Sequence, residues 1–247
     1  MRKISYILLA LALTAACKQR PKQAEEVAIP VEEAVQADTV AAKKAAQALP
    51  EEPVFAIVTN LGTIKVKLYK DTPKHRDNFA KLALSGYYDE LLFHRVINGF
   101  MIQGGDPFTR DSSLVEHYGE GGPKYTIPAE ILGAEGDTLH RHKKGALCAA
   151  RRGDVANPFR ASSGSQFYLV QDPAHCAHLD GAYTVFGETV AGFNVIDKIA
   201  REKTNRYDRP LRDVRIQSIR PDAEMNKKLQ EQAKKEKETA SAAQDLQ

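Results

Sequence analysis

Short runs of apolar and β-branched residues recur through the middle of the chain, with polar turns between them. Two such runs, 54–59 and 63–69, flank Asn60-Leu61-Gly62, a spacing that predicts a β-hairpin. The same pattern predicts further strands at 91–96, 100–104, 145–150, 166–170, 184–188 and 214–219.

Two other segments carry apolar residues at helical spacing. Thr72-Pro73 offers an N-cap and a first-turn proline, and Gly86 ends the helix that follows. The second helix is predicted from about 193 to 202, with Phe193, Ile196, Ile199 and Ala200 on one face. Many short strands with two helices predict a mainly β fold, a closed antiparallel β-barrel capped by two α-helices.

The two ends of the chain lack the apolar density that a core requires. Residues 18–52 are rich in Ala, Glu, Gln, Lys and Val, which predicts a flexible tether. Residues 221–247 are charged and predict a helical or disordered tail. One folded domain is therefore expected at 53–220, and this length is sufficient for a single core.

The first residues are typical of an export signal. Arg2 and Lys3 precede an apolar run at 7–13, and small residues lead to Cys17. The segment resembles the lipobox of bacterial lipoproteins, which implies cleavage after residue 16 and a lipid on Cys17. Thr14 departs from the usual Leu, and an ordinary secretory signal with an incidental Cys is the alternative.

Lipidation would anchor the protein in the cell envelope. Lys18 is not the Asp that retains familiar Gram-negative lipoproteins at the inner membrane, so the outer membrane, facing the periplasm, is the expected location.

Charge and cysteine content narrow the choice of partners. Lys and Arg total 35 and Asp and Glu total 32, a net charge of +3 that does not indicate nucleic-acid binding. Cys148 lies in an apolar run and Cys176 in a loop, so two free thiols are expected. His175, Cys176 and His178 lack the paired spacing of a zinc site, and no metal is predicted.

The stretch 93–106 carries the most chemical information. Alternation puts Met101 and Gln103 on one face of a strand, and Phe100 and Ile102 on the other. Arg95 lies on a preceding strand, across a turn at Asn98-Gly99. We therefore expect an arginine and a glutamine at the edge of an apolar hollow.

Three separated motifs, FHRVI…FMIQGGD, GSQFY and LDG…TVFG, resemble the cyclophilin family of peptidyl-prolyl cis-trans isomerases over about 54–219. The resemblance implies that Arg95 is catalytic, assisted by Gln103. It also implies a substrate site formed by Phe100, Met101, Ala150, Arg151, Gln166, Tyr168, His178, Leu179 and Tyr183.

This chain departs from the family's pattern at several of these positions. Tyr168 replaces a usual Phe, Tyr183 a frequent His, and His178 a frequent Trp, and the last change implies weak binding of cyclosporin. The segment 152–161 is additional, and its Asn157-Pro158 indicates a loop that shapes substrate choice. His94, His140 and His142 are expected to be solvated or locally hydrogen-bonded and not catalytic.

Rotation about an X-Pro bond breaks amide resonance but no covalent bond, so no nucleophile, metal or cofactor is needed. The leading hypothesis is a monomeric isomerase that acts on proline-containing polypeptides and assists folding of exported proteins. A non-catalytic module that binds proline-containing peptides and a lipid-anchored assembly partner are the alternatives.

Overall fold

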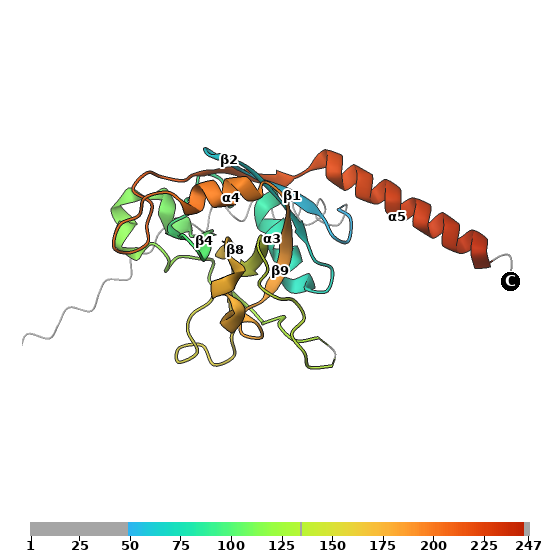
Figure 1. Cartoon of the computed structure of the whole chain (residues 1–247), viewed down its shortest axis with the longest axis horizontal. Helices are drawn as coiled ribbons and strands as arrows, with labels where there is room; N and C mark the ends of the chain where they lie inside the picture. Colours follow the sequence, from blue (N-terminus) through green and yellow to red (C-terminus); the bar gives the residue numbers. More distant parts are fainter. Residues whose placement is uncertain (1–48, 134, 245–247) are drawn as a thin grey trace, which may run out of the picture.

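The computed structural model describes residues 49–133 and 135–244. Its centre is an eight-stranded antiparallel sheet with the strand order β10-β1-β2-β9-β6-β8-β4-β3, and β5 pairs separately with β7 (Figure 1). The strands are β1 (Val54–Thr59), β2 (Gly62–Leu68), β3 (Arg95–Ile97), β4 (Met101–Gly104), β5 (Thr126–Ile127), β6 (Ala146–Ala149), β7 (Ser162–Ser163), β8 (Phe167–Val170), β9 (Val185–Ala191) and β10 (Ile216–Pro221).

The sheet is not the closed barrel that the sequence predicts. The end strands β3 and β10 do not pair with each other, and only an isolated bridge between Leu92 and Arg215 spans the gap. Hydrogen bonds from Phe93 to Val214 (2.9 Å) and from Ile216 to Leu91 (2.8 Å) support this bridge. Because β3 has only three residues, the ladder ends after β4 and closure depends on these few contacts.

Period-2 alternation divides the buried side chains between the two faces of the sheet. Ile102, Leu147 and Leu169 face the main core, which also contains the apolar side of the helices. Met101, Cys148 and Tyr168 face the opposite side and form a second, smaller cluster. The second cluster borders the candidate site, so alternation along β4, β6 and β8 decides which side chains reach it.

Two helices pack against the sheet, α3 (Pro73–Leu84) and α4 (Phe193–Ala200). Phe79 of α3 contacts the rings of Phe55, Phe167 and Phe186, which lie on three different strands. The N-terminus of α3 is satisfied by Glu130, which accepts from the amides of Lys74 and His75, both at 3.0 Å. Thr72 precedes the helix as expected, but its hydroxyl makes no capping bond.

The charged tail forms α5 (Ala223–Gln244), which projects from the domain as one long helix in Figure 1. Its first turn is anchored because Asn226 accepts from the Val54 amide at 2.7 Å and donates to the Val54 carbonyl at 2.9 Å. Among the described residues, no helix is both long and apolar enough to cross a membrane. The predicted signal, Cys17 and most of the tether lie outside the described residues.

Candidate active site

Arg95, Gln103 and Tyr168 lie in one row across three neighbouring strands. Arg95 of β3 is the register partner of Gln103 of β4, and Gln103 is the partner of Tyr168 of β8. Directly opposite side chains in such a ladder have Cβ atoms about 4.5–5.5 Å apart. The fold therefore brings together a guanidinium, an amide and an aromatic ring that are up to seventy residues apart in sequence.

The Arg95 guanidinium lies against an acidic residue that the sequence did not reveal as part of the site. Its Nε is 3.6 Å from Asp208 Oδ2, and both side chains are more than 40% exposed, at 43% and 44%. Asp208 has a positive φ of 61°, and its carbonyl accepts from the Val96 amide at 2.7 Å. Because Asp208 contacts the Nε side, the two terminal nitrogens of Arg95 remain available to a substrate.

A chain of amides fixes Gln103. Its Nε2 donates to Gln166 Oε1 at 3.0 Å, and Gln166 Nε2 donates to the carbonyls of Gly119 (2.9 Å) and Gly121 (2.7 Å). Both N–H groups of Gln166 are therefore used inside the protein. The carbonyl oxygen of Gln103 is the acceptor left to face a guanidinium or a substrate N–H.

Asp106 holds the loop that supplies these two carbonyls. This buried carboxylate accepts from the amides of Phe108, Gly119 and Gly121. Burial raises the pKa of Asp106, and the amide donors oppose that rise. A Cβ at position 121 would lie 2.1 Å from Asp106 Oδ1, so Gly121 is required for this close approach.

The predicted pocket walls gather in the second apolar cluster. Met101, Tyr168 and Leu179 are buried there, and Phe100 and Tyr183 pack against it part-exposed. The expectation that Phe100 shares a face with Ile102 is wrong, because Ile102 lies in the main core. Phe100 precedes β4 in a turn closed by its amide on the Ile97 carbonyl at 3.1 Å, so strand alternation does not apply to it.

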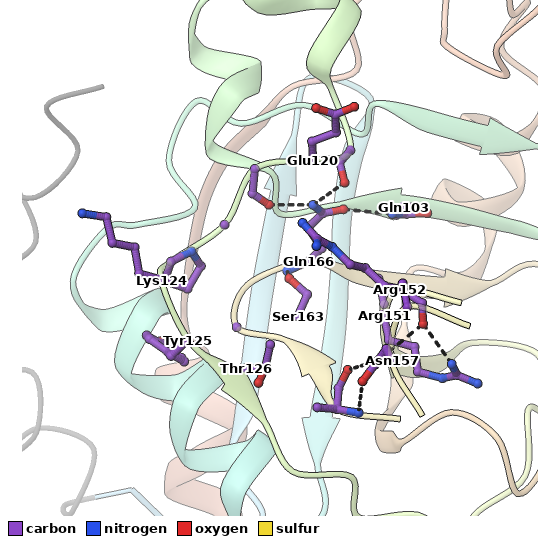
Figure 2. Close-up of a pocket in the computed structure, with 18 residues that line it drawn as sticks. Gln103, Glu120, Lys124, Tyr125, Thr126, Arg151, Arg152, Asn157, Ser163 and Gln166 are labelled. Atoms are coloured by element: carbon purple, nitrogen blue, oxygen red, sulfur yellow. Dashed lines mark hydrogen bonds between the residues drawn. The ribbon is translucent and has the colours of Figure 1, made fainter. Parts of the chain in front are cut away.

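A cavity of about 530 Å³ adjoins this row, and Gln103, Gln166 and Ala150 are part of its lining. Figure 2 shows Gln103 and Gln166 at one end, Arg152 and Asn157 on one side, and Lys124 and Tyr125 on the other. The additional loop 152–161 thus forms a wall of the cavity. It exposes Val155 and Phe159 almost fully to solvent.

Ala150 and Arg151 form the strand edge beside the cavity, but they differ in availability. Ala150 donates its amide to the Gln166 carbonyl at 3.0 Å, and its carbonyl accepts from the Ser163 amide at 2.8 Å. The Arg151 side chain is buried and donates to the Ala182 carbonyl at 2.9 Å, while its guanidinium stacks on the Tyr183 ring at 4.2 Å. The Arg151 side chain therefore braces the 182–183 loop and does not point at a substrate.

His178 is exposed and lines a second, open hollow together with Phe100. Within the described part of the chain, no group of three or more His, Cys, Asp and Glu side chains could hold a metal ion. Cys148 and Cys176 are both free thiols, as predicted, although Cys176 is buried despite its loop position. Burial raises the pKa of the Cys176 thiol to about 11, which keeps it protonated.

His94 does not follow the prediction that it is solvated or locally hydrogen-bonded. It is 5% exposed, and among the described residues neither ring nitrogen has a hydrogen-bond partner. Burial lowers the pKa of His94 to about 4, with Arg95 and Arg209 acting in the same direction. A neutral imidazole therefore lies beside Arg95. His140 does bond locally, to Asp71 at 2.9 Å.

A Ser-His-Glu arrangement that the sequence did not reveal lies nearby. His75 Nδ1 is 2.6 Å from Glu130 Oε2, and His75 Nε2 is 2.9 Å from the Ser162 hydroxyl. His75 and Ser162 are each only 1% exposed, and the hollow that His75 lines holds about 10 Å³. No substrate carbonyl can reach this serine, so the arrangement ties α3 to β7 and offers no hydrolytic site.

Comparison with known proteins identifies the fold and the site together. The family model for cyclophilin type peptidyl-prolyl cis-trans isomerase/CLD matches residues 54–221. The chain belongs to the cyclophilin family of peptidyl-prolyl cis-trans isomerases. The matched range coincides closely with the predicted domain, and it contains all of the predicted site residues except Cys17.

Relatives of this cyclophilin domain occur alone and within longer proteins. Peptidyl-prolyl cis-trans isomerase CYP18-1 of Arabidopsis thaliana is 39% identical over 162 residues, 65% of this chain and 91% of that protein. Peptidyl-prolyl cis-trans isomerase-like 2 of Rhizopus delemar is 40% identical over 66% of this chain, but the match spans only 28% of that longer protein.

A solved structure agrees with this assignment. The cyclophilin type peptidyl-prolyl cis-trans isomerase of Cryptosporidium parvum is similar with a TM-score of 0.59 and 28% identity, covering 70% of this chain and 98% of that one. Another structure of the Cryptosporidium protein, determined in the presence of the dipeptide Ala-Pro, is similar with a TM-score of 0.58.

Proposed function

We propose that this cyclophilin domain isomerises X-Pro bonds by hydrogen-bond donation from Arg95 to the prolyl nitrogen. The barrier to rotation is about 18–20 kcal/mol because amide resonance must be broken. In the twisted state the nitrogen gains a lone pair, and a donor that meets it only then lowers the barrier selectively. The observation that carries the proposal is the side-on contact of Asp208 with Arg95 Nε, which leaves the terminal nitrogens to donate.

The apolar cluster beside Arg95 would hold the proline ring while the rest of the chain rotates. Phe100, Met101, Tyr168, Leu179 and Tyr183 line it, and they leave Phe100 and Tyr183 partly accessible. The backbone of Arg151 would receive the substrate chain, because the main-chain groups of Ala150 are already bonded. Residues before the proline would then lie toward the cavity of Figure 2, where loop 152–161 would contribute to substrate choice.

Turnover distinguishes an isomerase from a module that only binds proline-containing peptides. In a protease-coupled assay with an Ala-Pro peptide, the wild-type chain is expected to show single-exponential acceleration proportional to enzyme concentration. Binding of the peptide without any acceleration would favour the binding module. Peptide titration followed by NMR measures the binding separately.

Cyclosporin is expected to inhibit this protein weakly. His178 presents a small, exposed ring to the hollow that Phe100 lines, whereas an indole would add apolar contact and an N–H donor. His178→Trp should tighten inhibition roughly tenfold, the equivalent of about 1.4 kcal/mol. Inhibition constants from the same assay test this, and equal constants for the two proteins would contradict it.

Lipid anchoring and the folding of exported proteins form the second part of the proposal. They rest on the sequence of the first 17 residues alone, since the family match begins at residue 54. A lipid on Cys17 would place the domain at the cell envelope, with residues 18–52 as a tether. Outer-membrane attachment facing the periplasm follows from Lys18 in a Gram-negative host.

A further inference from the structure

A buried chain of three polar side chains runs beneath the apolar cluster. His142 Nδ1 is 2.7 Å from Asp180 Oδ1, and His142 Nε2 is 2.9 Å from the Tyr168 hydroxyl. The His142 side chain is 0% exposed. Polar groups buried this deeply are stable only when their hydrogen bonds are made, so the three side chains constrain one another.

The partners fix where each proton lies. Asp180 Oδ1 also accepts from the His142 amide at 2.8 Å, and an ionised carboxylate can only accept. Nδ1 therefore carries the imidazole hydrogen, and the bare Nε2 must accept from the Tyr168 hydroxyl. Burial lowers the pKa of His142 although Asp180 opposes it, which keeps the ring neutral. Burial would raise the pKa of Asp180, but the bonds from His142 lower it overall.

The two ends of the chain lie in different walls of the pocket. Tyr168 belongs to β8 and has only 5% of its surface exposed, so its ring forms the floor. Asp180 directly follows Leu179 in the loop that continues to Tyr183. Arg151 holds the far end of this loop through the Ala182 carbonyl. The strand and the loop thus share no backbone ladder here, and His142 joins them.

We propose that His142 is a positioning residue of the isomerase site, which keeps the floor and one wall of the proline pocket in register by linking Tyr168 to Asp180. The proposal rests on the proposed function, because it takes the apolar cluster as the proline pocket. The hydroxyl of Tyr168 makes this link possible, and a phenylalanine at that position could not form it.

The test is a double-mutant cycle in the full chain, with KM and kcat measured for an Ala-Pro peptide. His142→Leu leaves the Tyr168 hydroxyl without its acceptor, and KM should rise roughly five- to tenfold while kcat stays within about twofold. Tyr168→Phe removes the stranded hydroxyl. His142→Leu introduced into the Tyr168→Phe background should therefore change KM by less than about twofold.

His142→Gln is the conservative control, because its amide oxygen can accept from Tyr168, and KM should remain within about threefold of wild type. This variant also keeps the test available if His142→Leu fails to fold. An unchanged KM in folded His142→Leu would overturn the proposal. A rise of equal size in both backgrounds would also overturn it, because the effect would then not pass through Tyr168.

Two readouts do not require turnover. Long-range ¹H–¹⁵N spectra should show His142 protonated at Nδ1 and bare at Nε2, and the opposite tautomer would refute the link. NMR titration with the Ala-Pro dipeptide should reproduce the KM pattern as a pattern of dissociation constants. If the wild type binds the dipeptide in this pattern but shows no acceleration, the proposed function fails and the positioning role of His142 stands.

Discussion

Arg95→Ala is expected to lower kcat/KM for an Ala-Pro peptide roughly 10²- to 10³-fold, the loss seen when one preorganised donor to a transition state is removed, about 2.7–4 kcal/mol. Most of the loss should fall on kcat, because the apolar cluster that would bind the proline ring remains intact. Arg95→Lys should recover little, since an ammonium lacks the planar fork that Asp208 contacts through Nε.

Stability should hardly change in the same variant. The Arg95–Asp208 pair is loose and more than 40% exposed, and exposed pairs of this kind contribute about 0–1 kcal/mol. A fall in melting temperature of more than about 4 °C would indicate a structural role for Arg95. Arg206→Ala is the matched control, since Arg206 contacts only the neighbouring Tyr207 and should leave both activity and stability unchanged. Near wild-type turnover of Arg95→Ala would refute the donor mechanism.

The parts of the site on regular strands could be predicted from sequence. Period-2 alternation places Met101 and Gln103 on one face, and the structure bears this out because both lie within β4. The same rule fails for Phe100, one residue earlier, because that residue belongs to a turn. The closed barrel failed for a related reason, since a pattern of apolar residues does not show that β3 is too short to pair with β10.

The supporting residues could not be predicted because they are distant in sequence and chemically ordinary. Asp208 lies 113 residues beyond Arg95 in a loop of mixed charges, and only the fold brings them to 3.6 Å. His142 was expected to be solvated or locally bonded, yet its partners are 26 and 38 residues away. The one available signal was Tyr168 itself, because a hydroxyl at a buried position requires a partner.

Cys17→Ser is expected to move the protein from the membrane fraction to the soluble fraction or to leave its signal uncleaved. A lipoprotein needs the Cys17 sulfur for its lipid, and one acyl chain gives only marginal binding, so firm attachment indicates several chains. Thr14→Leu is the matched control, because it brings the segment closer to the lipobox and should keep the protein in the membrane fraction.

Fractionation of cells that express each variant, with mass spectrometry of the mature N-terminus, measures both processing and lipid. Deletion of 18–52 should leave isomerase activity on a soluble peptide unchanged, because every predicted substrate-contacting residue lies between Arg95 and Tyr183. If Cys17→Ser is processed and fractionates like the parent, the lipid anchor is wrong and the ordinary secretory signal is favoured. The assignment to the cyclophilins would be unaffected, because it depends on residues 54–221.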